Sequence, residues 1–142
     1  HAARKSIDLF IGPVTQFNSL QQILRESLQP LWSLPQVGDI RQVGLVAGIE
    51  LVRDWRTREP FDLRERAGSR VCEALARRGV LTRPIGDVIV LMPPYCISPP
   101  QLRRAATALG EAIAEVFAGI SPARARAGTA LRRIPSRRPS SK

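Results

Sequence analysis

The stretch from residue 80 to residue 97, VLTRPIGDVIVLMPPYCI, limits most strongly what this chain can fold into. Its two apolar runs, residues 80–82 and 88–92, flank the link RPIGD, which begins at Arg83 and ends in Gly-Asp. Gly-Asp is a turn-forming pair, and apolar runs on both sides of such a pair are typical of a β-hairpin. We therefore predict two antiparallel strands joined by a turn, with Arg83 just before the turn.

Apolar residues recur at helical spacing in three other parts of the chain. They predict a helix over residues 20–29, a second from Asp62 to residue 78 with Gly79 as its C-cap, and a third from Ser98 to the closing Gly119. Each predicted helix start carries Ser or Asp three residues before Gln or Glu, which is the capping-box pattern.

Residues 37–52, VGDIRQVGLVAGIELV, have no helical spacing and contain three glycines, which predicts strands with a turn or bulge near Gly44. Residues 45–52 are almost all apolar, as expected of a strand covered on both faces. Residues 53–61 are charged and contain a proline, which predicts a surface loop. The alternation predicts an α/β (α+β two-layer) fold, in which helices cover one side of a small sheet that contains the hairpin.

The net charge of +10 is concentrated at the C-terminal end of the chain. Residues 119–142 hold seven of the 22 basic residues and none of the 12 acidic ones, so the rest of the chain is only mildly basic. Composition predicts a disordered arginine-rich tail over residues 119–142, an irregular segment over residues 1–17 and one domain over residues 18–118.

The tail leaves two alternatives to an enzyme open. Arginines bind nucleic acid largely through their charge, so a small basic nucleic-acid-binding module is one hypothesis, although the tail has no aromatic side chains for stacking on bases. A truncated gene product without activity is the other, because the chain begins with His1 and ends in a segment unlike its body.

The two cysteines, Cys72 and Cys96, have neither the spacing of a redox pair nor that of a metal site, and His1 is the only histidine. We predict no metal site, two buried reduced thiols and a cytoplasmic location. No apolar run approaches the roughly 18–20 residues of a membrane span, and no secretory signal is recognisable, so we predict no membrane partner.

Arg83 is the candidate binding residue, because a guanidinium among apolar neighbours needs an anionic partner. Its fork of N–H donors matches a carboxylate. The partner is either a carboxylate of the protein, Asp87 or Glu50, or an anionic ligand. The residues alone leave both possibilities open.

Residues 37–116 resemble the C-terminal small domain of the class III, pyridoxal-phosphate-dependent aminotransferases. The resemblance lies in VGDIRQVGLVAGIELV, in a helix ending RRGV, in LTRPIGDVIVLMPP and in the proline-capped amphipathic helix that follows. Within that family, RPIGDVIVLMPPYCIS is most similar to the members that act in biotin synthesis.

The resemblance implies a homodimer in which a large domain carries pyridoxal 5'-phosphate and the small domain closes over the substrate. In the biotin-pathway members the arginine of RPxG binds the carboxylate of 8-amino-7-oxononanoate, and S-adenosylmethionine donates the amino group. By match, that arginine is Arg83, and Ile85 would line the pocket for the aliphatic chain of the substrate.

The cofactor-binding lysine of such enzymes belongs to the large domain, and this chain has only Lys5 and Lys142 as lysines. A transaminase needs that lysine to hold the cofactor and to move a proton. We therefore predict that the chain supplies substrate binding, contains no catalytic or cofactor-binding residue, and is an inactive fragment by itself.

Overall fold

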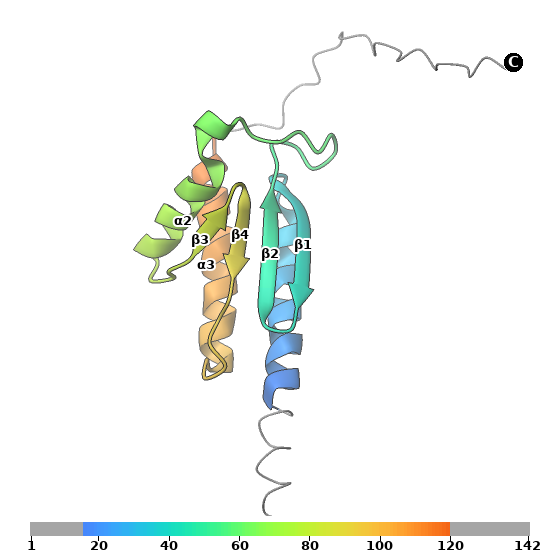
Figure 1. Ribbon diagram of the computed structural model, residues 1–142, viewed down its shortest axis with the longest axis vertical. Helices are drawn as coiled ribbons and strands as arrows, with labels where there is room; N and C mark the ends of the chain where they lie inside the picture. Colours follow the sequence, from blue (N-terminus) through green and yellow to red (C-terminus); the bar gives the residue numbers. More distant parts are fainter. Residues whose placement is uncertain (1–15, 120–142) are drawn as a thin grey trace, which may run out of the picture.

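Figure 1 shows the computed structural model, in which residues 16–119 are described. The arginine-rich tail after Gly119 and residues 1–15 of the predicted irregular segment lie outside this range. Gln16 and Phe17, which the sequence places in the irregular segment, belong to a helix that continues to residue 28.

The described residues form one sheet of four strands in the order β1-β2-β4-β3, and all neighbouring strands are antiparallel. Two hairpins build it, and β2 pairs with β4 to join them. Gly44 and Gly86 have positive φ values of 60° and 61°, which glycine adopts without the steric cost of a side chain and which tight hairpin turns require. The strands are β1 Val37–Val43, β2 Val46–Leu51, β3 Arg83–Ile85 and β4 Val88–Leu91.

The predicted hairpin is present, but the sequence misplaces its first strand. The strand is Arg83–Ile85 and not residues 80–82, because the two residues Gly86 and Asp87 suffice for the turn. Arg83 and Ile85 are therefore strand residues with defined faces, and Met92 lies just beyond the end of β4.

The helical elements follow the predicted order with shifted ends. The first helix already includes residue 16, so the predicted N-cap Ser19 lies inside it. After residue 28 the chain tightens into the 3-10 helix η1 Gln29–Ser33. The capping box of Asp62 is present, but it opens the short 3-10 helix η2 Leu63–Glu65, and α2 Ala67–Arg77 begins only after Arg66. The box of Ser98 and Gln101 opens α3 Pro99–Phe117 as predicted.

Helices cover one face of the sheet. In Figure 1 the N-terminal helix and α3 lie behind the strands, and α2, which packs on α3 and β3, lies beside them. Side chains from that sheet face and from all three helices form one core, with Leu24, Ile49, Leu75, Ile89 and Leu109 among its fully buried members. This is the predicted α/β arrangement.

The prediction that residues 45–52 are covered on both faces is wrong. Ala47, Ile49 and Leu51 are buried, whereas Val46 on the other face is 45% exposed. No helix among residues 16–119 is both long enough and apolar enough to cross a membrane.

Candidate functional site

The sheet face that the described helices leave uncovered, called here the outer face, carries the predicted binding residues. Directly paired residues of antiparallel strands share a face. Arg83 pairs with Val90, Val90 with Gly48, and Gly48 with Arg41, so one row crosses all four strands. The neighbouring row contains Ile85, Val88, Glu50 and Asp39.

Arg83 is exposed, and its side chain has no ion pair or hydrogen bond to the residues that the structure describes. Neither partner considered from the sequence contacts it. One carboxylate oxygen of Asp87 accepts a hydrogen bond from the Gly68 backbone N–H at 3.3 Å. Glu50 lies 3.7 Å from Arg41 instead. Within this part of the chain the Arg83 guanidinium is therefore available to an anion from outside.

Arg41, at the opposite end of the row, is in a different situation. Its guanidinium lies 3.3 Å from Asp39 and 3.7 Å from Glu50, so two carboxylates already neutralise it. The outer face thus has a paired arginine on β1 and an arginine without a partner on β3. This difference provides a matched comparison for any role of Arg83.

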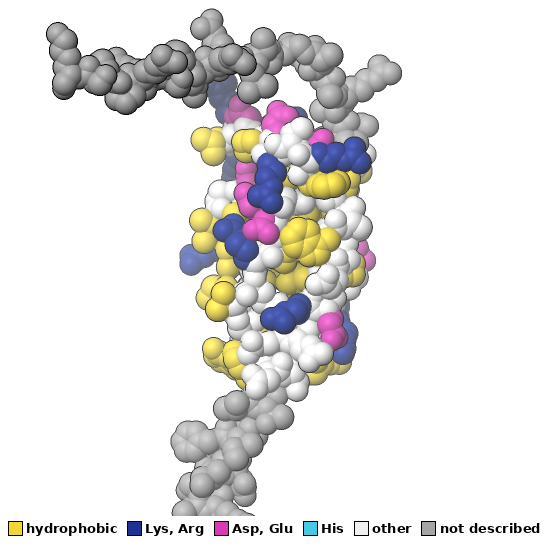
Figure 2. Space-filling model, turned by 90° about the vertical axis from the view of Figure 1, so that its right-hand side faces the viewer, with side chains coloured by type: hydrophobic (Ala, Val, Ile, Leu, Met, Phe, Trp, Pro, Cys, Tyr) yellow, Lys and Arg dark blue, Asp and Glu magenta, His cyan; other side chains and the backbone are white. Residues whose placement is uncertain are grey.

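Apolar groups surround Arg83. Ile85, two residues along the same strand and on the same face, is 68% exposed, and Val88 and Val90 on β4 are half-buried. Gly48 leaves the middle of the row without a side chain. An anionic group on Arg83 could therefore continue into an aliphatic part lying along these side chains. Figure 2, which views the molecule from its β1 side, shows hydrophobic side chains on the surface among charged ones.

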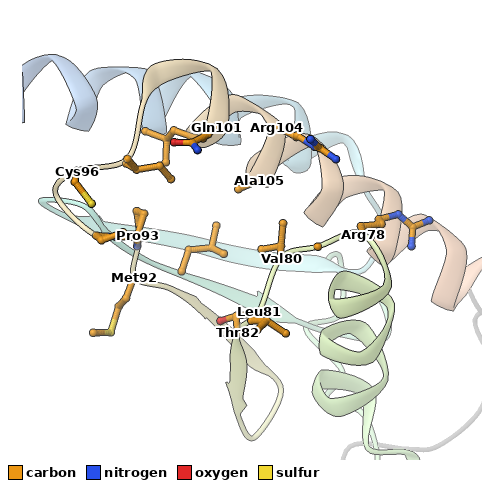
Figure 3. Close-up of a pocket in the computed structure, with 15 residues that line it drawn as sticks. Arg78, Val80, Leu81, Thr82, Met92, Pro93, Cys96, Gln101, Arg104 and Ala105 are labelled. Carbon is orange, nitrogen blue, oxygen red and sulfur yellow. The ribbon is translucent and has the colours of Figure 1, made fainter.

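A cavity of about 640 Å³ lies between α3 and the segments that flank β3 and β4, and Arg83 does not line it. Figure 3 shows its walls, with Met92, Pro93 and Cys96 after β4, Leu81 and Thr82 before β3, and Gln101 and Ala105 on α3. Sequence reasoning misses this cavity, because its lining residues come from separate segments and form no motif.

Arg78 and Arg104 stand at one end of this cavity. The Arg78 guanidinium points away from it and lies 2.6 Å from Glu115 and 3.4 Å from Glu111. The hydrogen bond that Arg78 donates to Glu115 is the main reason that the pKa of Arg78 is raised. Burial, the second-largest effect, lowers this pKa, and the charge of Glu115 together with the hydrogen bond and charge of Glu111 raises it further. Arg78, which follows α2 directly, thus forms ion pairs with two glutamates of α3 and links the two helices.

The described residues do not fit pyridoxal phosphate as a covalently held cofactor, because residues 16–119 contain no lysine. They also include no group of three or more His, Cys, Asp or Glu side chains that could hold a metal ion. Cys72 and Cys96 are both free thiols, as predicted, but only Cys72 is buried. Cys96 is exposed because it lies in the turn between β4 and α3.

The chain is similar to known aminotransferases over most of its length. The family model described as aminotransferase class-III matches residues 7–113 of the 142. A relative from Geobacter sulfurreducens, named adenosylmethionine-8-amino-7-oxononanoate aminotransferase, is 44% identical over 119 residues, which cover 82% of this chain and 26% of that protein. A relative of the same name from Nitratidesulfovibrio vulgaris is 48% identical over 103 residues, which cover 71% of this chain and 19% of that protein.

The fold agrees with a solved structure of the same name. The crystal structure of adenosylmethionine-8-amino-7-oxononanoate aminotransferase from Methanocaldococcus jannaschii matches with a TM-score of 0.72 and 37% identity, over 80% of this chain and 26% of that one. The chain therefore spans about a quarter of the length of these two relatives, from Geobacter and Methanocaldococcus. With a family match over residues 7–113, and with its sheet and helices arranged as in that structure, the chain belongs to the class III aminotransferase family.

Proposed function

We propose that this chain is the C-terminal part of a biotin-pathway aminotransferase. The enzyme would convert 8-amino-7-oxononanoate to 7,8-diaminononanoate with S-adenosylmethionine as the amino donor. The observation that carries the proposal is the availability of Arg83, in the run RPIGDVIVLMPP, to an anion from outside the described residues. The names of the similar proteins from Geobacter and Nitratidesulfovibrio support the same reaction.

In this proposal Arg83 binds the carboxylate of 8-amino-7-oxononanoate, and Ile85 packs against its aliphatic chain. A guanidinium can donate two parallel N–H bonds to a carboxylate, which fixes the orientation of the bound molecule. The position of Ile85 on the same face, beside Val88, suits an apolar chain that leaves the carboxylate. The cofactor lysine would lie in the part of the enzyme outside this chain. The complete enzyme would form the homodimer that the family resemblance implies.

The proposal also includes a cytoplasmic location, which two free cysteines support because disulfides are rare in the cytosol. The nucleic-acid alternative depends on residues after Gly119, which lie outside the described range. Nothing on the described surface favours that alternative.

A chimeric enzyme tests the role of Arg83. In the chimera, this chain replaces the matching 119-residue segment of the Geobacter relative. We expect the chimera to transfer the amino group from S-adenosylmethionine to 8-amino-7-oxononanoate. Arg83→Ala should then cost about 2–3 kcal/mol of transition-state binding, or roughly 30- to 150-fold in kcat/KM for the oxo acid, because a charged hydrogen-bonding group is lost. Arg83→Lys should give a kcat/KM between those of the unchanged chimera and Arg83→Ala, since lysine keeps the charge but not the two parallel N–H donors.

The matched control is Arg41→Ala, which removes the same side chain from the same row of the sheet. Because Asp39 and Glu50 already neutralise Arg41, this change should leave KM for the oxo acid almost unaltered. The half-reaction with S-adenosylmethionine, measured in single turnovers, should be nearly unchanged in both variants. Equal losses in Arg83→Ala and Arg41→Ala, or equal damage to both half-reactions, would make Arg83 a structural residue and contradict the proposal.

A further inference from the structure

The tip of the β3–β4 hairpin is held from two sides. On one side, the backbone N–H of Leu51, the last residue of β2, donates to the Asp87 carbonyl at 2.8 Å. On the other, the backbone N–H of Gly68 in α2 donates to the Asp87 side chain at 3.3 Å. Asp87 therefore connects the hairpin to the end of a neighbouring strand and to the start of a helix.

Gly68 lets α2 come unusually close to this hairpin. A Cβ atom at Gly68 would lie 2.4 Å from the Gly86 carbonyl oxygen and 2.8 Å from the Pro84 Cβ. The first of these atoms is backbone, so it cannot rotate out of the way. A side chain at position 68 would have to push the hairpin and the helix apart.

Asp87 also caps α2 from a distance. The residue at the N-cap position, Arg66, has a left-handed backbone and makes no side-chain cap hydrogen bond, so α2 has no cap of its own. A carboxylate is favourable at a helix N-terminus, because the first N–H groups there have no intrahelical acceptor and the helix dipole is positive. Helix start and hairpin tip thus stabilise each other through one side chain.

Arg83 depends on this contact for its location. Its own side chain has no partner among residues 16–119, and β3 is a three-residue edge strand that pairs only with β4. Pro84, the next residue, points to the opposite face, toward Gly68. The place of the guanidinium is therefore set by the hairpin backbone, and the hairpin tip is fixed at Asp87.

We propose that Asp87 and Gly68 are positioning residues for Arg83, which hold it where the carboxylate of the substrate binds although neither contacts the outer face. This inference rests on the proposed function of Arg83. It adds two residues, 19 positions apart in the sequence, on which oxo-acid binding depends.

The chimera described above carries the kinetic test. Asp87→Ala removes the acceptor and should raise KM for 8-amino-7-oxononanoate about five- to tenfold, with a smaller change in kcat and no change in KM for S-adenosylmethionine. Asp87→Asn keeps an oxygen that can accept the Gly68 N–H, so it should recover most of the loss. Gly68→Ala should raise the same KM at least as much, because the new methyl group displaces the hairpin.

The decisive measurement combines Asp87→Ala with Arg83→Ala. If Asp87 acts through Arg83, its removal adds nothing to KM for the oxo acid once Arg83 is absent, because the group that it positions is gone. A further rise of the same five- to tenfold in the Arg83→Ala background would overturn the inference. Asp62→Asn is the control, since Asp62 accepts the backbone N–H of Arg64 in η2 and not an N–H that links α2 to the hairpin, and it should leave KM unchanged.

A second readout separates this inference from the proposed function. In the 142-residue chain itself, hydrogen exchange at the Leu51 amide reports the hydrogen bond to Asp87. Asp87→Ala and Gly68→Ala should speed this exchange at least tenfold, and Asp62→Asn should not. Unchanged exchange in both variants would overturn the anchoring of the hairpin. Faster exchange together with an Arg83→Ala variant of normal KM would leave the anchoring in place and overturn the role of Arg83.

Discussion

The two cysteines show how far a single residue can be understood before its surroundings are known. The sequence predicts the same buried, reduced state for both, because their spacing is neither that of a redox pair nor that of a metal site. The free thiols are confirmed, but Cys96 is exposed and Cys72 lies in α2 against the core. Burial, with the neighbouring charge of Glu73 second, raises the pKa of the Cys72 thiol.

A thiol reagent should therefore distinguish the two residues. In the folded chain near neutral pH, we expect one thiol, Cys96, to react rapidly and the second, Cys72, at least tenfold more slowly, because attack requires an accessible thiolate. Stopped-flow absorbance with an aromatic disulfide reagent measures both rates, and Cys96→Ser is the control that should abolish the fast phase. If both thiols of the folded chain reacted as fast as the thiols of the unfolded chain, the buried position of Cys72 would be contradicted.

Arg83 was predictable as a residue of interest, whereas its surroundings were not. The apolar neighbours of a lone arginine are visible in the sequence, and they indicate a group that needs a partner. Which carboxylate is near depends on strand register, which places Glu50 next to Asp39 and Arg41 on β1 and sends the Asp87 side chain to α2. The roles of Gly68 and Asp87 arise from a contact between segments that are distant in the sequence, and no local sequence pattern predicts that contact.

At the level of elements, capping chemistry was a good guide to helix starts where the cap is local. Ser98 begins α3 and Asp62 begins η2, each with the reciprocal bonds of a capping box. Ser19 has the same pattern but lies within a helix, since nothing in a capping pattern prevents a helix from continuing through it. The start of α2 was missed because its cap comes from the hairpin, outside the local sequence.

The contact between α2 and α3 should depend on pH. Hydrogen bonds from Arg78 and then Arg77 lower the pKa of Glu115 below its ordinary value of 4.5. A lowered pKa means that the interaction stabilises the fold above the ordinary pKa and is lost as the pH falls through the lowered one. Glu115→Gln should therefore lower Tm at pH 7, and the difference from the unchanged chain should shrink as the pH is lowered past 4.5 toward 3.

Thermal unfolding followed by circular dichroism measures this difference across the pH range. Glu73→Gln is a suitable control, because it removes an exposed glutamate from α2 for which the structure gives no ion pair. Its effect on Tm should be small at every pH. A Glu115→Gln difference that stays constant from pH 7 to pH 3 would contradict an ionic contribution from Glu115.

At the scale of the whole molecule, the alternation of helical and strand patterns correctly predicted two layers with helices on one side of the sheet, whereas the apolar run of residues 45–52 was misleading. An apolar run such as residues 45–52 suggests a strand covered twice. In the described residues helices cover only one side, and large apolar side chains remain exposed on or next to the outer face, with Val43 at 83% and Met92 at 71%. The match to about a quarter of the relatives' length is consistent with a face that the rest of an enzyme would cover.

The chain alone should not catalyse amino transfer. Its only lysines, Lys5 and Lys142, lie outside residues 16–119 and outside the family match. Adding pyridoxal phosphate, S-adenosylmethionine and 8-amino-7-oxononanoate to the purified chain should therefore give no 7,8-diaminononanoate by mass spectrometry, with the chimera as the positive control. Product formation that persists in a Lys5→Arg and Lys142→Arg double variant would remove the need for a lysine from elsewhere and contradict the proposed division of roles.

The strand order β1-β2-β4-β3 also has a consequence for how the chain is made. Each hairpin closes over a few residues and can form as soon as it leaves the ribosome, but the pairing of Ala47 with Leu91 joins the two hairpins across the whole of α2. During synthesis, one edge of β2 therefore stays unpaired until β4 has left the ribosome. The time needed to synthesise the residues between β2 and β4 therefore sets how long a nascent chain offers this unpaired edge to neighbouring chains.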